Sequence, residues 1–384
     1  MRSRPSLSWC SHVSALAATV DCVVSAARPS RFMRCVVSLA LALAVVPACS
    51  APQQIGSPDA RVADAPPTDA HDAAANVPDA PSIDAPAHFR GPPYPIVFAH
   101  GFFGFEHFAG LDYIDYFFHV REALAMSGET NVYFTGVDPF NTSVVRGAQL
   151  ADQIQHILDT TGYRQVTIIG HSQGGLDARV VAHDHPEWVA AVYTIATPHA
   201  GTPVSDVVDR LISDPRLRDA LNAIASLVYT PLYTTTGATT SVWLGLDQFN
   251  RPNMVTFNAA YPDVATLPYY SIGGRSAGAN GGAECNFNGR PSFITRWDHD
   301  LDPIDPALSV TGLILNGSDP FNPIPNDGLV PVPSSRHGTF LGCIPADHLD
   351  EIGHILGDSP GIGNDFDHYQ FYRDLVAYVR ASGL

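Results

Sequence analysis

The chain of 384 residues contains no lysine, so its 21 basic side chains are all arginine, against 38 acidic ones, and the formal charge is −17. A nucleic-acid binder needs a basic surface to contact phosphates, and adsorption to anionic lipid needs a basic patch. The shortage of positive charge therefore argues against both classes. Residues 1–48 and 49–90 carry +4 and −4, so the whole negative surplus lies on 91–384.

No long apolar run is available to cross a membrane near the N-terminus. Residues 35–46 (CVVSLALALAVV) form a run of about a dozen residues, whereas a spanning helix needs about 20. The run follows Met33, an alternative start, and resembles the central part of a signal peptide, so we expect a leader over 1–48. Two outcomes are open: cleavage after Ala48, or lipidation of Cys49, although a proline two residues earlier is unusual for lipidation. We therefore expect a bacterial protein that is secreted or held as an outer-membrane or cell-surface lipoprotein.

Large apolar residues are also scarce in residues 49–90, where Asp-Ala and Pro-Asp-Ala units recur. Such a segment cannot bury enough surface to offset its ordering entropy. The composition predicts a disordered, extended and charged linker.

Cysteine is rare in the remaining segment, which contains only Cys285 and Cys343. Because exported proteins keep cysteines oxidised, these two residues are expected to form one disulfide. Two free, buried thiols are the alternative.

Residues 91–384 predict one α/β domain with a mostly parallel sheet covered by helices on both faces. Near-continuous apolar runs predict buried strands, and Leu150, Ile154, Ile157 and Leu158 have helical spacing. The expected strands are 94–99, 131–136, 165–170 and 189–196, and the expected helices are 114–127, 147–161, 174–184 and 369–381. The apolar, threonine-rich stretch 204–250 begins as a helix at Val204–Ile212 and interrupts this alternation. It is either a lid or an ordinary helical insertion.

The sequence Gly170-His-Ser-Gln-Gly174 matches G-x-S-x-G between a strand-like run and a helix-like start. That context is typical of a nucleophile elbow, where a strained turn exposes the serine beside a base. The two glycines leave room for the neighbouring strand and helix. Ser172 is therefore the predicted nucleophile.

Attack by a serine on an ester creates an oxyanion, which needs two backbone N–H donors already in place. The residue after the nucleophile supplies one of them, here Gln173. The loop after an early strand supplies the other, and His100-Gly-Phe-Phe-Gly104 follows the first predicted strand. Phe102 is the expected second donor; a plain turn is the alternative.

The chain resembles the secreted bacterial triacylglycerol lipases of the Pseudomonas and Burkholderia type over residues 94–384. The motifs that carry the resemblance occur in the family order: YPIVFAHGFFGF, NTSVVRGAQL, VTIIGHSQGG, ATPHAG, FNAAYP, NDGLVPVPSS and DHLDEIGHILG. The resemblance implies an α/β-hydrolase fold, a mobile helical lid and a structural calcium ion. Some relatives also require a dedicated foldase, so the resemblance leaves open whether this chain needs such a partner.

The catalytic acid and base follow the nucleophile in the chain order Ser, acid, His of this fold. His348 lies in the segment that resembles the catalytic-histidine loop, and His337 is the competing candidate. Asp327 ends a turn-rich run before a strand-like one, which places it between nucleophile and histidine; Asp319 is the second candidate. Ser172, Asp327 and His348 are therefore expected to form the triad, in which the acid orients the imidazole.

The calcium-binding carboxylates of the family match Asp302 and Asp350, and its two carbonyl ligands match His354 and Asp358. This chain departs from the usual residues at both carbonyl positions. Calcium prefers oxygen ligands of these kinds, and the ion would hold the loop that bears His348. The cysteine positions are shifted from those of the family. A pair of surface aspartates without a metal is the alternative.

These observations predict a serine hydrolase that cleaves carboxylic esters of lipids, most simply a triacylglycerol lipase, without an organic cofactor. The expected partner is a lipid ester at an interface. A short-chain carboxylesterase, a polyester depolymerase, a lipid acyltransferase and a catalytically inactive binding domain are the alternatives. The complete set of three triad residues argues against the last of these.

Overall fold

The computed structural model describes residues 90–104, 115–216, 218–219, 222, 236, 239–276, 282–316, 324–353 and 360–384. All of them belong to the second of two units of the chain, Ala85–Leu384. The predicted leader, the linker up to residue 89, and the lipidation candidate Cys49 lie outside the described residues. Among the described residues, no helix combines the length and the apolar character needed to cross a membrane.

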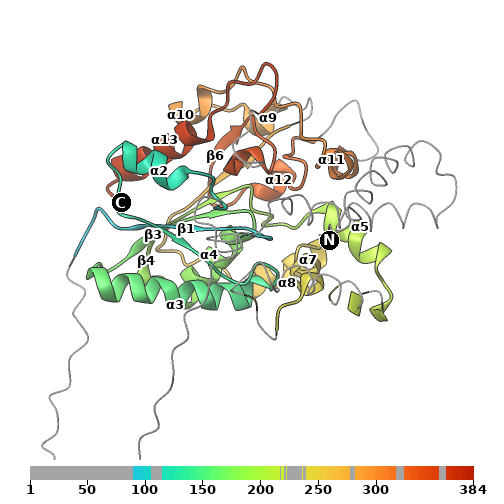
Figure 1. Cartoon of the computed structure of the whole chain (residues 1–384), viewed down its shortest axis with the longest axis horizontal. Coiled ribbons are helices and arrows are strands. Elements are labelled where there is room, and N and C mark those ends of the chain that lie inside the picture. Colours follow the sequence, from blue (N-terminus) through green and yellow to red (C-terminus); the bar gives the residue numbers. More distant parts are fainter. Residues whose placement is uncertain are drawn as a thin grey trace, which may run out of the picture. The chain divides into compact units, whose positions relative to one another are not determined.

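The architecture is one parallel sheet of six strands in the order β2-β1-β3-β4-β5-β6 (Figure 1). Each of the five neighbouring pairs is parallel. The strands are β1 Ile96–Ala99, β2 Val132–Thr135, β3 Val166–His171, β4 Val189–Ile195, β5 Tyr269–Gly274 and β6 Thr339–Ile344. β1, β2 and β4 fall within the predicted runs, and β3 extends one residue beyond its predicted end at 170.

Helices cover both faces of the sheet, as predicted (Figure 1). One face carries α3 Ser143–Thr161 and α4 Gln173–Asp184, and the other carries α2 Val120–Met126, α10 Ser292–Thr295 and α13 His368–Ala381. The remaining helices are η3 Pro186–Trp188, α5 Pro203–Leu211, α7 Val242–Gln248, α8 Arg251–Ala260, α9 Gly282–Cys285, α11 Ser309–Asn316, α12 Val332–Ser335 and η4 Asp350–Ile352.

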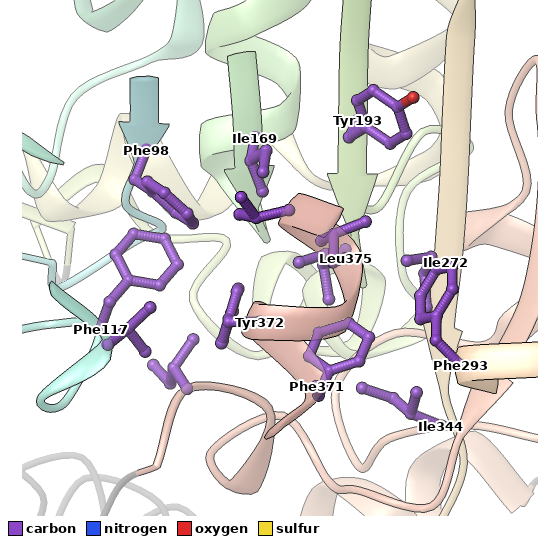
Figure 2. Close-up of a cluster of buried hydrophobic side chains, with 14 of the residues drawn as sticks. Phe98, Phe117, Ile169, Tyr193, Ile272, Phe293, Ile344, Phe371, Tyr372 and Leu375 are labelled. Carbon is purple, nitrogen blue, oxygen red and sulfur yellow. The ribbon is translucent and has the colours of Figure 1, made fainter. Parts of the chain in front are cut away.

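Alternate residues of the strands face the two helical layers, which gives two cores. Phe98 of β1 and Tyr193 of β4 pack with Tyr372 of α13 in one core (Figure 2). Val97 and Ile168 pack with the α3 side chains in the other. Because the central strands are buried on both faces, they read as continuous apolar runs rather than as alternating ones.

The predicted lid region is partly described. Its first helix is α5, as expected from Val204–Ile212, and its end is formed by α7. Residues 217, 220–221, 223–235 and 237–238 lie outside the described residues. The lid role of 204–250 stays a prediction.

Candidate active site

Ser172 lies at the sharp turn between β3 and α4, where the sequence motif predicted a nucleophile elbow. Its backbone has φ +54° and ψ −126°, a conformation that is costly for a residue with a side chain. A Cβ at Gly170 would lie 2.5 Å from the carbonyl carbon of Gly174. Gly170 is therefore required by the close approach of β3 and α4, and Gly174 by the close approach of α4 to Ala99 O at the end of β1.

The structure brings Ser172, His348 and Asp327 together, although they are far apart in the chain. Ser172 Oγ lies 2.9 Å from His348 Nε2, and His348 Nδ1 lies 2.8 Å from Asp327 Oδ2. A carboxylate only accepts hydrogen bonds, so Nδ1 carries the ring proton and Nε2 faces the serine hydroxyl as an acceptor. This is the arrangement that a general base needs.

The loop around Asp327 fixes its carboxylate. Oδ1 accepts the backbone N–H groups of Leu329 (2.8 Å) and Val330 (2.6 Å), which leaves Oδ2 for the imidazole. The His348 N–H also donates to the Asp327 carbonyl oxygen at 2.9 Å. The expected strand after Asp327 is wrong: Val332–Ser335 forms the short helix α12, because Pro331 and Pro333 favour a helical first turn over strand pairing.

The competing residues lie elsewhere. His337 stacks on His199 with ring centroids 4.2 Å apart, and its Nε2 lies 2.9 Å from Asp263 Oδ1. It therefore has no contact with Ser172 among the described residues. Asp319, the second acid candidate, lies outside the described residues.

The oxyanion candidates lie beside the nucleophile. Gln173 is the first residue of α4, where backbone N–H groups have no partner within the helix. In the loop after β1, Phe103 N–H donates to Pro139 O and Gly104 N–H donates to Gly101 O. The Phe102 N–H has no hydrogen-bond acceptor among the described residues. A Cβ at Gly101 would lie 2.7 Å from Ser172 Cβ, which places this loop against the nucleophile.

A buried ion pair that sequence reasoning missed supports the same loop. Arg146 is fully buried, and its Nη2 donates to His100 O (2.6 Å) and its Nη1 to Asp138 O (2.8 Å). Its Nε donates to Asp177 Oδ2 at 2.8 Å. Burial outweighs this pairing and raises the pKa of Asp177 to about 6. The only sequence feature that could have indicated this role of Arg146 is its position in the NTSVVRGAQL motif.

A second buried acid, also missed, lies close to the triad histidine. Glu351 Oε2 is 3.9 Å from His348 Nδ1 and 2.7 Å from His171 Nε2. His171 Nδ1 in turn lies 2.7 Å from the Tyr116 hydroxyl. Burial, followed by the neighbouring acids, raises the pKa of Glu351 well above its usual range. Only its position three residues after His348 could have indicated it.

An acidic cluster lies next to the histidine loop. Carboxylate oxygens of Asp302, Asp347 and Asp350 lie within 4.8 Å of one another, and all three residues are buried. Burial and the two neighbouring acids raise the pKa of Asp350 to about 9. Three buried carboxylates at this distance form a set of hard oxygen ligands, which fits calcium. Asp347 was not predicted; its carboxylate also accepts the backbone N–H groups of Asp305, Leu349 and Asp350 and so closes the loop.

The other predicted site residues divide into two groups. Cys285 and Cys343 form a disulfide, with Cα atoms 5.3 Å apart. His354 and Asp358, the predicted carbonyl ligands, lie outside the described residues.

Comparison with known proteins places this geometry in a family. A model of the alpha/beta hydrolase fold matches residues 94–300. Triacylglycerol lipase of Vibrio cholerae is 33% identical over 269 residues, covering 69% of this chain and 81% of the relative. Triacylglycerol lipase of Burkholderia plantarii is 29% identical over 295 residues, covering 69% of this chain and 80% of the relative.

The crystal structure of Staphylococcus hyicus lipase shares the fold, with a TM-score of 0.55 at 19% identity, over 75% of this chain and 96% of that one. The chain therefore belongs to the α/β-hydrolase family, in which its relatives include bacterial triacylglycerol lipases.

Proposed function

We propose that this protein is a serine carboxylic-ester hydrolase that acts as a triacylglycerol lipase. The observation that carries the proposal is the continuous contact from Ser172 Oγ through the His348 ring to Asp327, with distances of 2.9 and 2.8 Å. Two relatives, from Vibrio cholerae and Burkholderia plantarii, are triacylglycerol lipases, which supports the same reaction class and the same substrate class.

In this mechanism, Ser172 Oγ attacks the ester carbonyl while His348 Nε2 takes the hydroxyl proton. The negative charge that develops on the carbonyl oxygen is accepted by the N–H groups of Phe102 and Gln173. The imidazolium, stabilised by Asp327, then gives its proton to the leaving alcohol. Water, deprotonated by the same imidazole, attacks the acyl-enzyme and releases the fatty acid. No organic cofactor takes part in these steps.

Calcium is the proposed metal for the acidic cluster. Asp302 and Asp350 would hold the ion, with Asp347 beside them, and the carbonyls of His354 and Asp358 are the further predicted ligands. When bound, the ion supplies positive charge to the three buried carboxylates and so stabilises the loop that begins at His348. It lies outside the path of the reaction.

The cellular setting is part of the proposal. The leader over 1–48 would direct export, after which the protein is either released or held at the surface through lipidated Cys49. The linker would then separate the domain from its attachment point. A lid formed by 204–250 and a requirement for a foldase are carried over from the resemblance.

Replacement of the nucleophile tests the proposal most directly. Ser172→Ala should lower the hydrolysis of a water-insoluble triglyceride to the level left by binding alone, a loss of about 10⁶ in kcat by analogy with other serine hydrolases. Thr160→Ala, on the exposed side of α3, is the control and should retain full activity. Unchanged hydrolysis by Ser172→Ala would refute the nucleophile.

A chain-length series separates the alternatives that share this machinery. A lipase should hydrolyse emulsified long-chain triglyceride faster than dissolved short-chain ester. Faster hydrolysis of the short-chain ester would indicate a carboxylesterase. Release of soluble products from polyester films would indicate a depolymerase. Formation of new esters when alcohol is added would indicate an acyltransferase.

A further inference from the structure

Asn141 lies in the 138–143 loop, which leads into α3. It contacts the start of residues 239–248, here called the α7 segment, and Gln173, which follows the nucleophile. It is buried, and its side-chain Nδ2 donates to Asp138 Oδ2 (3.3 Å) and to the carbonyl oxygen of Thr239 (3.0 Å). Its own backbone carbonyl accepts Gln173 Nε2 at 2.8 Å. One asparagine thus contacts both the predicted lid region and the residue that follows the nucleophile.

The bond to Gln173 has a particular importance because Gln173 is enclosed completely. Its side chain is 0% exposed, and its Oε1 has no hydrogen-bond partner among the described residues. The bond from Nε2 to Asn141 is therefore the polar contact that orients this amide. Because the same residue supplies an oxyanion N–H, displacement of its side chain would rotate that N–H away from the reacting oxygen.

The α7 segment grips the same loop at both of its ends. At the start, the Thr240 hydroxyl donates to Asp138 Oδ2. At the end, Gln248 Nε2 donates to Ser143 Oγ at 2.9 Å. In between, a Cβ at Gly245 would lie 2.5 Å from the Phe102 ring, so α7 packs directly on the second oxyanion candidate.

The 138–143 loop is also connected to the loop that carries Phe102. The Asp138 carbonyl and the His100 carbonyl are both held by Arg146, at 2.8 and 2.6 Å. Asp138 is thus linked through Arg146 to the loop that carries Phe102, and Asn141 is linked directly to Gln173. Both predicted oxyanion donors are tied to the few residues that α7 holds.

We propose that Asn141 is a positioning residue that sets the oxyanion donors and couples their alignment to the docking of the 239–248 segment. The inference rests on the proposed ester hydrolysis and deepens it. Asn141 does not touch the substrate; its amide donors keep the loop in place, and the loop keeps Gln173 in place. Loss of those donors should impair stabilisation of the tetrahedral intermediate more than binding of the ester.

Asn141→Asp tests the proposal, because it keeps the shape and the backbone carbonyl but removes the two Nδ2 donors. Removing an entire oxyanion donor costs about 10²–10³ in kcat, so partial misalignment should lower kcat about 10-fold while KM stays within about twofold. The affinity for a boronic acid, which forms a tetrahedral adduct with the serine, should fall by the same factor as kcat/KM. Binding of a non-covalent alkyl inhibitor should not change.

Asn253→Ala is the matched control, since this asparagine of α8 joins α7 to α8 through Asp247 O (2.9 Å) and makes no hydrogen bond to the 138–143 loop among the described residues. It should leave the boronic acid affinity unchanged. Thr240→Val is a milder second variant, to be used if Asn141→Asp does not fold. It removes the hydrogen bond from the α7 segment to Asp138 and should lower kcat severalfold. Active-enzyme concentration is measured by phosphonate titration.

A double-mutant cycle gives the deciding measurement. Gln173→Met keeps the backbone N–H but breaks the bond to Asn141, so Asn141→Asp should cause a smaller loss of boronic acid affinity in that background than in the wild type. An equal loss in both backgrounds, or an equal effect of Asn253→Ala, would overturn the proposal. If Ser172→Ala retained activity, the proposed function would fail instead, independently of these results.

Discussion

Replacement of Arg146 by methionine should destabilise the protein in a manner that depends on pH. In the wild type, the fully buried guanidinium bonds Asp177 and two carbonyl oxygens, of His100 and Asp138. Arg146→Met leaves both carbonyls without a partner, which costs about 1–3 kcal/mol each in free energy of unfolding. It also leaves the carboxyl of Asp177 buried without its cation.

The pH dependence follows from the pKa of Asp177. In the wild type that pKa is about 6, raised from 3.8, so the group lowers stability as pH rises from about 4 to 6 and has no further effect above 6. Without Arg146 the folded-state pKa rises further, and the variant keeps losing stability above pH 6, by at most about 1.4 kcal/mol per pH unit. The difference between the two proteins should therefore grow by up to about 2.7 kcal/mol from pH 6 to pH 8.

Urea denaturation at pH 6, 7 and 8 measures this difference. The variant Arg146→Met/Asp177→Asn lacks the titrating group, so its loss of stability relative to the wild type should be the same at all three values. A loss in Arg146→Met that does not change between pH 6 and 8 would refute the reasoning. The activity should fall together with stability, because the loop that bears Phe102 loses its anchor at His100.

Four further predictions concern the triad, acid stability, the disulfide and the metal. Asp327→Asn should lower kcat by about 10⁴ because the imidazole is held in the wrong tautomer, with little change in KM, as steady-state kinetics would show. Burial, followed by Arg146, lowers the pKa of His100 from 6.5 to about 3, so the unfolded state binds more protons between these values, and stability is full above pH 6.5 and falls by about 1.4 kcal/mol per unit below it. His100→Gln should remove this slope in denaturation curves; an unchanged slope would contradict the assignment. Cys285→Ala/Cys343→Ala opens a closure of 58 residues and should cost about 4 kcal/mol in denaturant unfolding. Chelation should lower the melting temperature and activity, and added calcium should restore both; no effect of either treatment would argue against the metal site.

The strands β1 to β4 could be predicted because burial on both faces makes them continuous apolar runs. β5 and β6 escaped prediction because glycines interrupt their patterns. Gly274 is required where β5 approaches Ala346 O, and Gly342 has φ +128° near a register shift between β5 and β6. These glycines serve tertiary contacts, which a local pattern does not contain.

The three residues of the proposed triad could be predicted to lie together because chain order and local motifs restrict them. The supporting charges could not be assigned, because the burial of Arg146, Glu351 and Asp347 is a property of the assembled fold. Each lies in or beside a motif that was recognised, but a motif does not show which of its charged residues turns inward. The strand expected after Asp327 failed for a local reason, two prolines that favour a helical turn.

Because β6 lies at the edge of the described sheet, local opening there affects some residues of the site and not others. The turn of the proposed nucleophile is built from β3 and α4 in the interior, whereas the proposed acid precedes β6 and the proposed base follows it. Among the described residues, β6 pairs with β5 alone. An opening confined to this edge would separate Asp327 and His348 from an intact Ser172 turn, at a smaller free energy than global unfolding. The bond between Cys343 of β6 and Cys285 of α9 lies on this strand and limits its excursion. Activity therefore depends on the pairing of β6 with β5, and it can be lost while most of the fold persists.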